Sequence, residues 1–168
     1  MILVYACENP PRGYAKSLFL VGPTPRDPET PSWRPNAIRI LAEKRYSGVV
    51  FIPECRDGGF LPNYEDQIEW EERCLHLADV ILCWVLREMI KMPALTTNDE
   101  WGVWKSSGKV VFGAPPEAQH VRYQKYYAKK LNVPTADTLE GTIDLALAML
   151  GSGEYRSYGE REVPLYIW

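Results

Sequence analysis

The most constraining feature of the sequence is an uninterrupted apolar run at residues 80–86, near the middle of the chain. A run of this length, rich in branched aliphatic residues, is typical of a strand buried on both faces, as central strands of parallel sheets are. Residues 87–93 contain charged residues and a proline, so a loop is expected to follow the strand. This segment therefore predicts a parallel sheet with helices on both faces.

Directly after this loop, residues 97–100 fit the capping box S/T-x-x-E that begins a helix. We therefore expect Glu100 in a first helical turn, just beyond the carboxyl end of a central strand, where ligands bind in open α/β sheets. A helix amino terminus favours an ionised carboxylate by up to about 1 kcal/mol. Two interpretations stay open: Glu100 is a nucleophile, or it only caps its helix.

The rest of the chain alternates between strand and helix patterns. Further strands are expected at residues 1–7, 16–21, 48–53 and 109–114, and helices at 33–45, 64–78, 121–131 and 139–150. Ser32 and Thr138 are expected N-caps, and Gly151 ends the last helix. The alternation predicts a doubly wound, flavodoxin-like α/β fold with a mostly parallel sheet of about five strands and an extra N-terminal strand.

The length favours one domain, which we place at residues 1–151. Residues 152–168 form a tail that fits no helix, and its apolar end at 163–168 is expected to be an edge strand or a segment packed on a neighbouring subunit.

A second acidic residue attracts attention within the helix expected at residues 64–78. Ile68, Leu75 and Ala78 share one stripe of that helix, and Glu71 falls inside the stripe. A carboxylate among core-facing positions is costly unless it is paired, hydrogen-bonded or exposed to a cavity. Glu71 is therefore a second candidate for chemistry. The alternative is a helix-end carboxylate held by a neighbouring arginine.

Composition and charge exclude several classes of function. The net charge is −3 with no block of like charges, so no nucleic-acid partner is expected. No apolar run approaches the roughly 18 residues of a membrane span, and no signal peptide is evident, so we expect a cytoplasmic protein. The cysteines are scattered and no ligand set for zinc is present, so no metal site is expected.

Several motifs, taken in order, resemble the nucleoside 2-deoxyribosyltransferase-like family. They are Phe-Leu-Val-Gly-Pro-Thr-Pro at 19–25, Ser-Trp-Arg-Pro at 32–35, Gln67 with Trp-Glu at 70–71, Ala-Asp-Val-Ile-Leu at 78–82, and Met-Pro-Ala-Leu-Thr-Thr-Asn-Asp-Glu-Trp-Gly at 92–102. The resemblance spans roughly residues 16–150. It implies a small doubly wound domain that assembles into homo-oligomers and needs no cofactor.

The resemblance also implies roles for the two acids. Glu100 matches the glutamate that accepts the glycosyl group, and Glu71 matches the acidic residue that orders the sugar and the nucleophile. Glu71 replaces the aspartate of well-studied members. Residues 92–94 lack the aspartate that contacts the base in those members, and Arg87 or Glu88 is the expected substitute.

The other expected substrate contacts are Gly22, Pro23, Trp33 and Asn98. Gly22 would let a substrate approach the backbone closely, although it also fits a plain turn. Trp33, with Trp101 and Trp104, is a candidate wall of the pocket, although such residues are as often core or interface. If the substrate is a nucleotide, three arginines could hold its phosphate, unless they are solvated surface residues: Arg26, Arg34 and Arg39.

The activity implied is cleavage of the N-glycosidic bond of a nucleoside or deoxynucleotide through a covalent glycosyl-glutamate, followed by transfer to a free nucleobase. If water instead enters, the protein is a hydrolase. A non-catalytic nucleotide-binding module with the same fold is the alternative from a different class.

Overall fold

The centre of the molecule is a parallel sheet, seen here in a computed structural model that describes residues 1–58 and 63–157. The sheet has six strands in the order β1-β4-β3-β5-β6-β7, and each neighbouring pair is parallel. Its strands are β1 (Ile2–Tyr5), β3 (Ser17–Val21), β4 (Val49–Ile52), β5 (Val80–Trp84), β6 (Val110–Gly113) and β7 (Thr135–Ala136). Apart from β1, this is the flavodoxin-like order, which confirms the predicted fold class.

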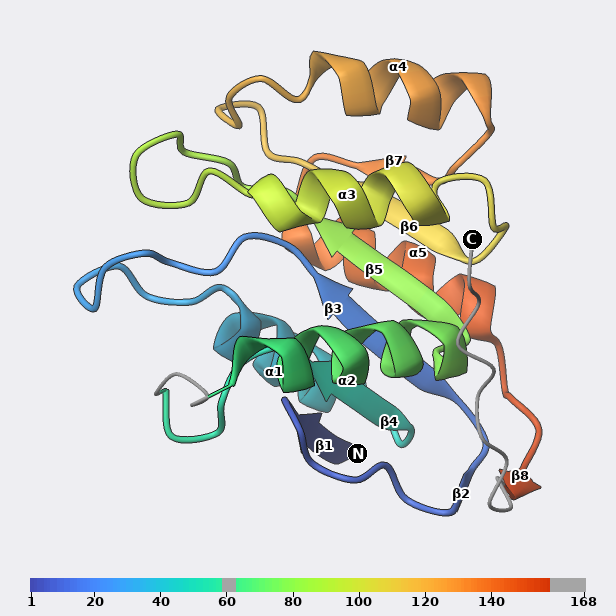
Figure 1. Cartoon of the computed structure of the whole chain (residues 1–168). Helices are drawn as coiled ribbons and strands as arrows, with labels where there is room; N and C mark the ends of the chain where they lie inside the picture. The colour runs from blue at the N-terminus through green and yellow to red at the C-terminus, as the bar shows by residue number, and fades with distance from the viewer. Residues whose placement is uncertain (59–62, 158–168) are drawn as a thin grey trace.

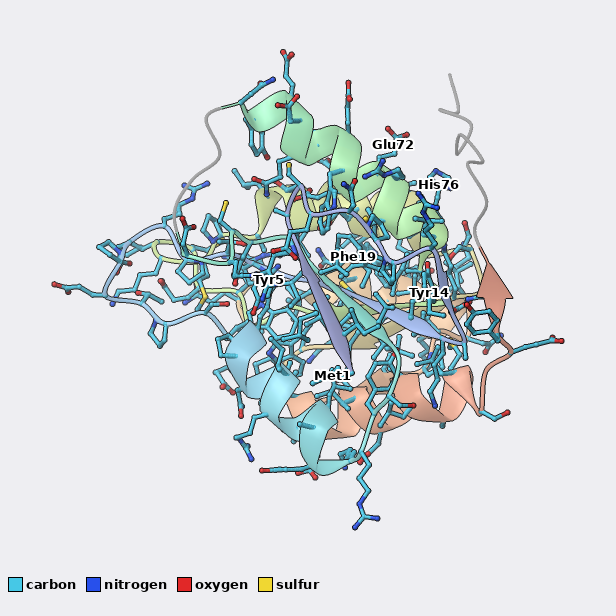
Figure 2. The ribbon with its side chains drawn as sticks, turned by 90° about the horizontal axis from the view of Figure 1, so that it is seen from below. Met1, Tyr5, Tyr14, Phe19, Glu72 and His76 are labelled. Carbon is cyan, nitrogen blue, oxygen red and sulfur yellow. The ribbon has the colours of Figure 1, made fainter. Side chains whose placement is uncertain are left out.

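Five helices cover the two faces of the sheet (Figure 1). One face carries α1 (Arg34–Glu43) and α5 (Leu139–Leu150), and the other carries α2 (Tyr64–Leu77), α3 (Leu95–Trp104) and α4 (Arg122–Lys130). Figure 2 shows the sheet between α2 on one side and α1 and α5 on the other. The division follows from right-handed crossovers, because the chain runs from β3 to β4 in one direction and from β4 onward in the other.

The strands bury both of their faces, as their apolar runs predict. Along β3, Phe19 and Val21 join the core under α2 and α3, whereas Leu18 and Leu20 join the core under α1 and α5. The same alternation of side chains runs through β4, β5 and β6. The two cores hold the central strands in place, so the loops at their carboxyl ends start from rigid positions.

The last helix has the predicted ends. The Thr138 hydroxyl accepts a hydrogen bond from the amide of Gly141 at 3.0 Å, and Gly151 has a φ of 58° at the carboxyl end. Both features are ordinary helix caps, so local sequence alone determines the length of α5.

The outer edge of β1 is occupied by side chains of the same protein. Arg56 donates to the Leu3 carbonyl at 3.2 Å, and the Tyr5 amide donates to Glu8 at 3.0 Å. Arg56 and Glu8 also form an ion pair at 2.6 Å, with the guanidinium 4.3 Å from the centre of the Tyr5 ring. The outward carbonyl of Leu3 and the outward amide of Tyr5 are thus hydrogen-bonded without a further strand.

The chain beyond α5 returns to the amino-terminal region. There, β8 (Arg156–Ser157) pairs antiparallel with β2 (Gly13–Tyr14), and Arg156 forms an ion pair with Asp79. The apolar end of the tail at 163–168, expected as an edge strand or a contact with a neighbouring subunit, lies outside the described residues. Among the helices described, none is long and apolar enough to cross a membrane.

Close packing of β6 against α5 leaves no room for a side chain at Gly113. A Cβ atom there would lie 2.0 Å from the Thr142 hydroxyl and 2.6 Å from the Trp84 ring. We expect Gly113→Ala to lower the free energy of unfolding by about 1–3 kcal/mol through overpacking. Urea denaturation measures this change.

Gly102 is the matched control, because it lies in α3 with no atom within 4 Å of the position its Cβ would take. Gly102→Ala is expected to raise stability by about 0.5–1 kcal/mol. Unchanged stability of Gly113→Ala would contradict the packing described here.

Candidate active site

The candidate site lies where the direction of chain winding reverses. The neighbouring strands β3 and β5 send their following helices, α1 and α3, to opposite faces of the sheet. The loops after these two strands therefore diverge (Figure 1). In open α/β sheets this divergence creates the crevice in which ligands bind.

A buried arginine holds one side of this edge together. Arg34, the first residue of α1, is 1% exposed and donates to the carbonyls of Leu20 at 3.2 Å and Gly22 at 2.7 Å. It also donates to the Thr24 hydroxyl at 3.1 Å and forms an ion pair with Glu54 at 2.6 Å. One guanidinium thus joins the loop after β3 to the loop after β4.

This arrangement corrects the expectation for the arginines. Arg34 is neither solvated nor available for a phosphate, because its donors are used inside the protein. Arg39 does lie exposed on α1, where it pairs with Glu43 one helical turn away. Arg26 is exposed in the loop after β3.

Glu71 occupies α2 with a different helical orientation from the one expected. Trp70 and Cys74 are buried, whereas Ile68 is 47% exposed, so the stripe drawn through Ile68 was wrong. The indole of Trp70 donates to the Glu8 carbonyl at 2.8 Å and fixes the rotation of the helix. Glu71 consequently lies at the border of the buried face and is partly exposed.

The Glu71 carboxylate is held by an amide rather than by an ion pair. Gln67, one turn earlier on α2, donates to Oε1 of Glu71 at 2.7 Å. Burial raises the pKa of Glu71, while the Gln67 hydrogen bond and the charge of Arg34 oppose this rise. The i, i+4 spacing of Gln67 and Glu71 is a signal in the sequence that could have identified Gln67 as a partner.

Glu100 lies one turn deeper in its helix than expected. The helix α3 begins at Leu95, after Ala94 in a left-handed conformation with φ 57°. The capping box does not form, because Thr97 lies inside the helix and is 3% exposed. Glu100 is therefore in the second turn, where the helix dipole has less influence.

The ionisation of Glu100 is also opposite to the sequence expectation. Burial and the repulsion of Glu71 raise the pKa of Glu100 to about 8, and Arg34 opposes the rise. The fold thus brings Glu71 and Glu100 close enough to interact, from different helices, and places Arg34 within electrostatic reach of both. Two carboxyl groups that disfavour each other's charge are typical of functional sites.

Glu100 is neither sealed in the interior nor free in bulk water. Its side chain is partly exposed and borders a gap between α3 and the sheet that is too narrow to hold a water molecule, lined also by Val21, Ile81, Cys83, Trp101, Trp104 and Val110. A roomier hollow of about 270 Å³ lies at the opposite edge, beside Lys16, Asp79 and Arg156. We place the candidate site at Glu100 because there two partly exposed acids from different helices interact electrostatically.

Three of the expected substrate contacts form one packed unit. A Cβ at Gly22 would lie 2.3 Å from the Trp84 carbonyl and 2.8 Å from the Trp33 ring. Trp33 is 5% exposed, and its indole donates to the Pro23 carbonyl at 3.2 Å. The protein's own packing therefore requires the glycine. Contact of Gly22, Pro23 and Trp33 with a substrate stays a prediction.

The other two expected contacts, Glu88 and Asn98, have hydrogen-bond partners other than the two acids. Glu88 accepts from the amides of Ile90 at 3.2 Å and Lys91 at 2.7 Å, so it shapes its own loop. Asn98 is two residues from Glu100, which places it on nearly the opposite side of α3. Contact of Glu88 and Asn98 with a substrate stays a prediction, and the side chain of Asn98 leaves α3 on a different side from that of Glu100.

The fold and the acid pair define a class of protein, namely a doubly wound α/β domain with interacting carboxyl groups at the carboxyl edge of its central strands. A model of the family described as nucleoside 2-deoxyribosyltransferase like matches residues 15–118, more than half of the chain. The chain belongs to the nucleoside 2-deoxyribosyltransferase-like family. The match includes both acids and ends before α4. A comparison with curated proteins found no match.

The raised pKa of Glu100 makes stability depend on pH. Because the folded protein holds this proton more tightly than the unfolded chain, stability is lost as pH rises from the ordinary value of 4.5 to about 8. Glu100→Gln removes this loss. We expect its Tm to exceed that of the wild type by at least about 2 °C at pH 8 and to differ little at pH 5, as measured by thermal unfolding. Equal Tm values at pH 8 would contradict the electrostatics of the pair.

Proposed function

We propose that the protein cleaves the N-glycosidic bond of a nucleoside or deoxynucleotide and transfers the sugar to a second nucleobase. The family supplies the substrate class. The observation that carries the proposal is the pairing of Glu100 with Glu71 at the carboxyl edge of β5, where Glu100 keeps partial exposure. A poorly solvated carboxylate at this edge is suited to attack an electron-poor sugar carbon.

In the proposed reaction Glu100 attacks C1′ from the face opposite the base. A bond forms between its carboxylate oxygen and C1′ as the bond from C1′ to the base nitrogen breaks. The electron pair goes to the base, which takes up a proton. A nitrogen of the second base then attacks C1′ and gives up its proton, while the C1′–O bond breaks, which releases the glutamate and restores the original configuration, as in retaining glycosidases.

The electrostatics of the acid pair favour this step. Positive charge develops on the sugar ring in the transition state, and it does so beside two carboxyl groups. The ester that follows removes the charge of Glu100 and with it the repulsion from Glu71. We assign Glu71 the role of ordering the sugar and Glu100, with Gln67 fixing one of the Glu71 oxygens.

Removal of the nucleophile is the direct test. We expect Glu100→Gln to fold and to lose turnover by about 10³-fold or more, and Glu71→Gln to lose less. Glu72→Gln, which changes the next residue on α2 (Figure 2), is the matched control and should keep full activity. Chromatography of a deoxynucleoside mixed with a second free base measures transfer, and release of free sugar measures hydrolysis.

Intact-mass spectrometry distinguishes the three functions. A gain of one deoxyribosyl unit in the wild type, absent from Glu100→Gln, supports the covalent mechanism. Binding without bond cleavage, equal in both proteins, would instead support a non-catalytic module. Activity largely retained in Glu100→Gln would exclude Glu100 as the nucleophile.

The pKa of Glu100 predicts a pH profile. Since only the ionised carboxylate attacks, kcat/KM should rise with pH, reach half its maximum near pH 8 and level off above roughly pH 9. Glu71→Gln removes the repulsion that raises this pKa, so the rising limb should move to lower pH even as the maximum rate falls. A rising limb at the same pH in both proteins would contradict this coupling.

A further inference from the structure

A second buried cation lies at the same edge of the sheet, just after β5. Arg87 is 5% exposed and forms no ion pair with any described residue. It donates to the His120 carbonyl at 3.0 Å and to Oδ1 of Asn98, while its Nε finds no acceptor within residues 1–58 and 63–157. A buried charge that meets only neutral groups is costly, and here burial lowers the pKa of Arg87.

The position of the unpaired Nε–H on the Arg87 guanidinium indicates which kind of ligand would complete its hydrogen bonding. In a guanidinium the Nε–H and one Nη2–H are parallel and together bind the two oxygens of a carboxylate or phosphate. At Arg87 this edge holds a single neutral oxygen, that of Asn98. Of these two parallel N–H donors of Arg87, one binds Asn98 and the other has no acceptor in the described part of the chain.

The same edge faces the amino end of a helix. Asn98 is the fourth residue of α3, and no side chain within residues 1–58 and 63–157 caps that helix, whose N-cap position is Ala94. An uncapped helix amino terminus favours an anion. Two independent features, the helix end and the half-used arginine, therefore point to the same kind of ligand.

Asn98 accepts a hydrogen bond from Arg87 and another from Gln124. Asn98 is exposed, and its Oδ1 also accepts from Gln124 at 2.7 Å, while the Gln124 oxygen has no partner in the described part of the chain. Because arginine only donates, the oxygen of Asn98 must face it. That oxygen occupies the position that an anionic oxygen would take.

This cluster lies at the same strand end as the candidate nucleophile, on a different side of α3. Cys83, at the carboxyl end of β5, is influenced by the charges of both Glu100 and Arg87. The two groups therefore flank one strand end. The other arginines considered for an anion are less suitable: Arg34 donates inside the protein, Arg39 pairs with Glu43 on the opposite face of the sheet, and Arg26 is exposed to solvent.

We propose that Arg87 and the amino end of α3 bind the phosphate of the substrate, with Asn98 moving aside, so that the substrate is a nucleoside 5′-monophosphate. This inference rests on the proposed function for the identity of the substrate. The phosphate site itself does not depend on turnover.

The experiment uses isothermal titration calorimetry on Glu100→Gln, the variant expected to lose turnover. The ligands are a 2′-deoxynucleoside, its 5′-monophosphate, 2-deoxyribose 5-phosphate and inorganic phosphate. We expect the monophosphate to bind at least about 10-fold more tightly than the nucleoside, the scale of one charge-assisted contact. We also expect it to bind more tightly than either base-free phosphate.

Asn98→Asp in the same background is the decisive variant. It places a carboxylate on the free edge of Arg87, so we expect a higher Tm and affinities for the monophosphate and the nucleoside that no longer differ. Arg26→Gln, which removes an exposed positive charge from a neighbouring loop, is the matched control and should keep the difference.

Each outcome decides the proposal. Equal affinities for nucleoside and monophosphate overturn it, as does an advantage of the monophosphate that survives in Asn98→Asp. Inorganic phosphate binding as tightly as the monophosphate also overturns it, because the site would then recognise phosphate alone. If the monophosphate binds as expected but the wild type does not cleave it, the phosphate site stands and the proposed reaction fails.

Discussion

The buried guanidinium of Arg34 is the interaction on which the carboxyl edge of the sheet depends. It binds a carbonyl near the end of β3, a carbonyl in the loop after β3, and the carboxylate of Glu54 in the loop after β4. The loops after β3 and β4 are thereby held at fixed positions relative to each other. The same charge opposes the rise in pKa of Glu71 and Glu100. One cation therefore organises the loops and makes the proximity of two acids tolerable.

The pairing of Glu71 with Glu100 makes the folded protein less stable than it would be with a neutral residue at position 100. Burial and mutual repulsion both disfavour the charge of Glu100, and Arg34 compensates only in part. A neutral side chain at this position would fold at least as well. Retention of an acid where the fold disfavours its charge is a typical sign of function, because natural sequences depart from local consistency mainly at sites that perform chemistry.

The sequence was informative where local signals determine structure. The apolar runs located β3, β4, β5 and β6, and Thr138 with Gly151 bounded α5. The start of α3 could not be predicted, because it depends on a left-handed Ala94 that no residue type announces. The rotation of α2 depends on the bond from Trp70 to Glu8, a contact between distant segments. The burial of Arg34 likewise depends on contacts with distant segments, so the sequence indicated only a phosphate-binding or a solvated position for it.

The side chains bound along the outer edge of β1 oppose pairing of this strand with a strand of another molecule. An open edge strand invites strands from other molecules to extend the sheet. Here Arg56 donates to the outward carbonyl of Leu3, and Glu8 accepts from the outward amide of Tyr5. A continuous intermolecular sheet through β1 would have to displace an ion pair and a stacked guanidinium. A contact made at the β1 edge would therefore depend on side chains rather than on backbone hydrogen bonds.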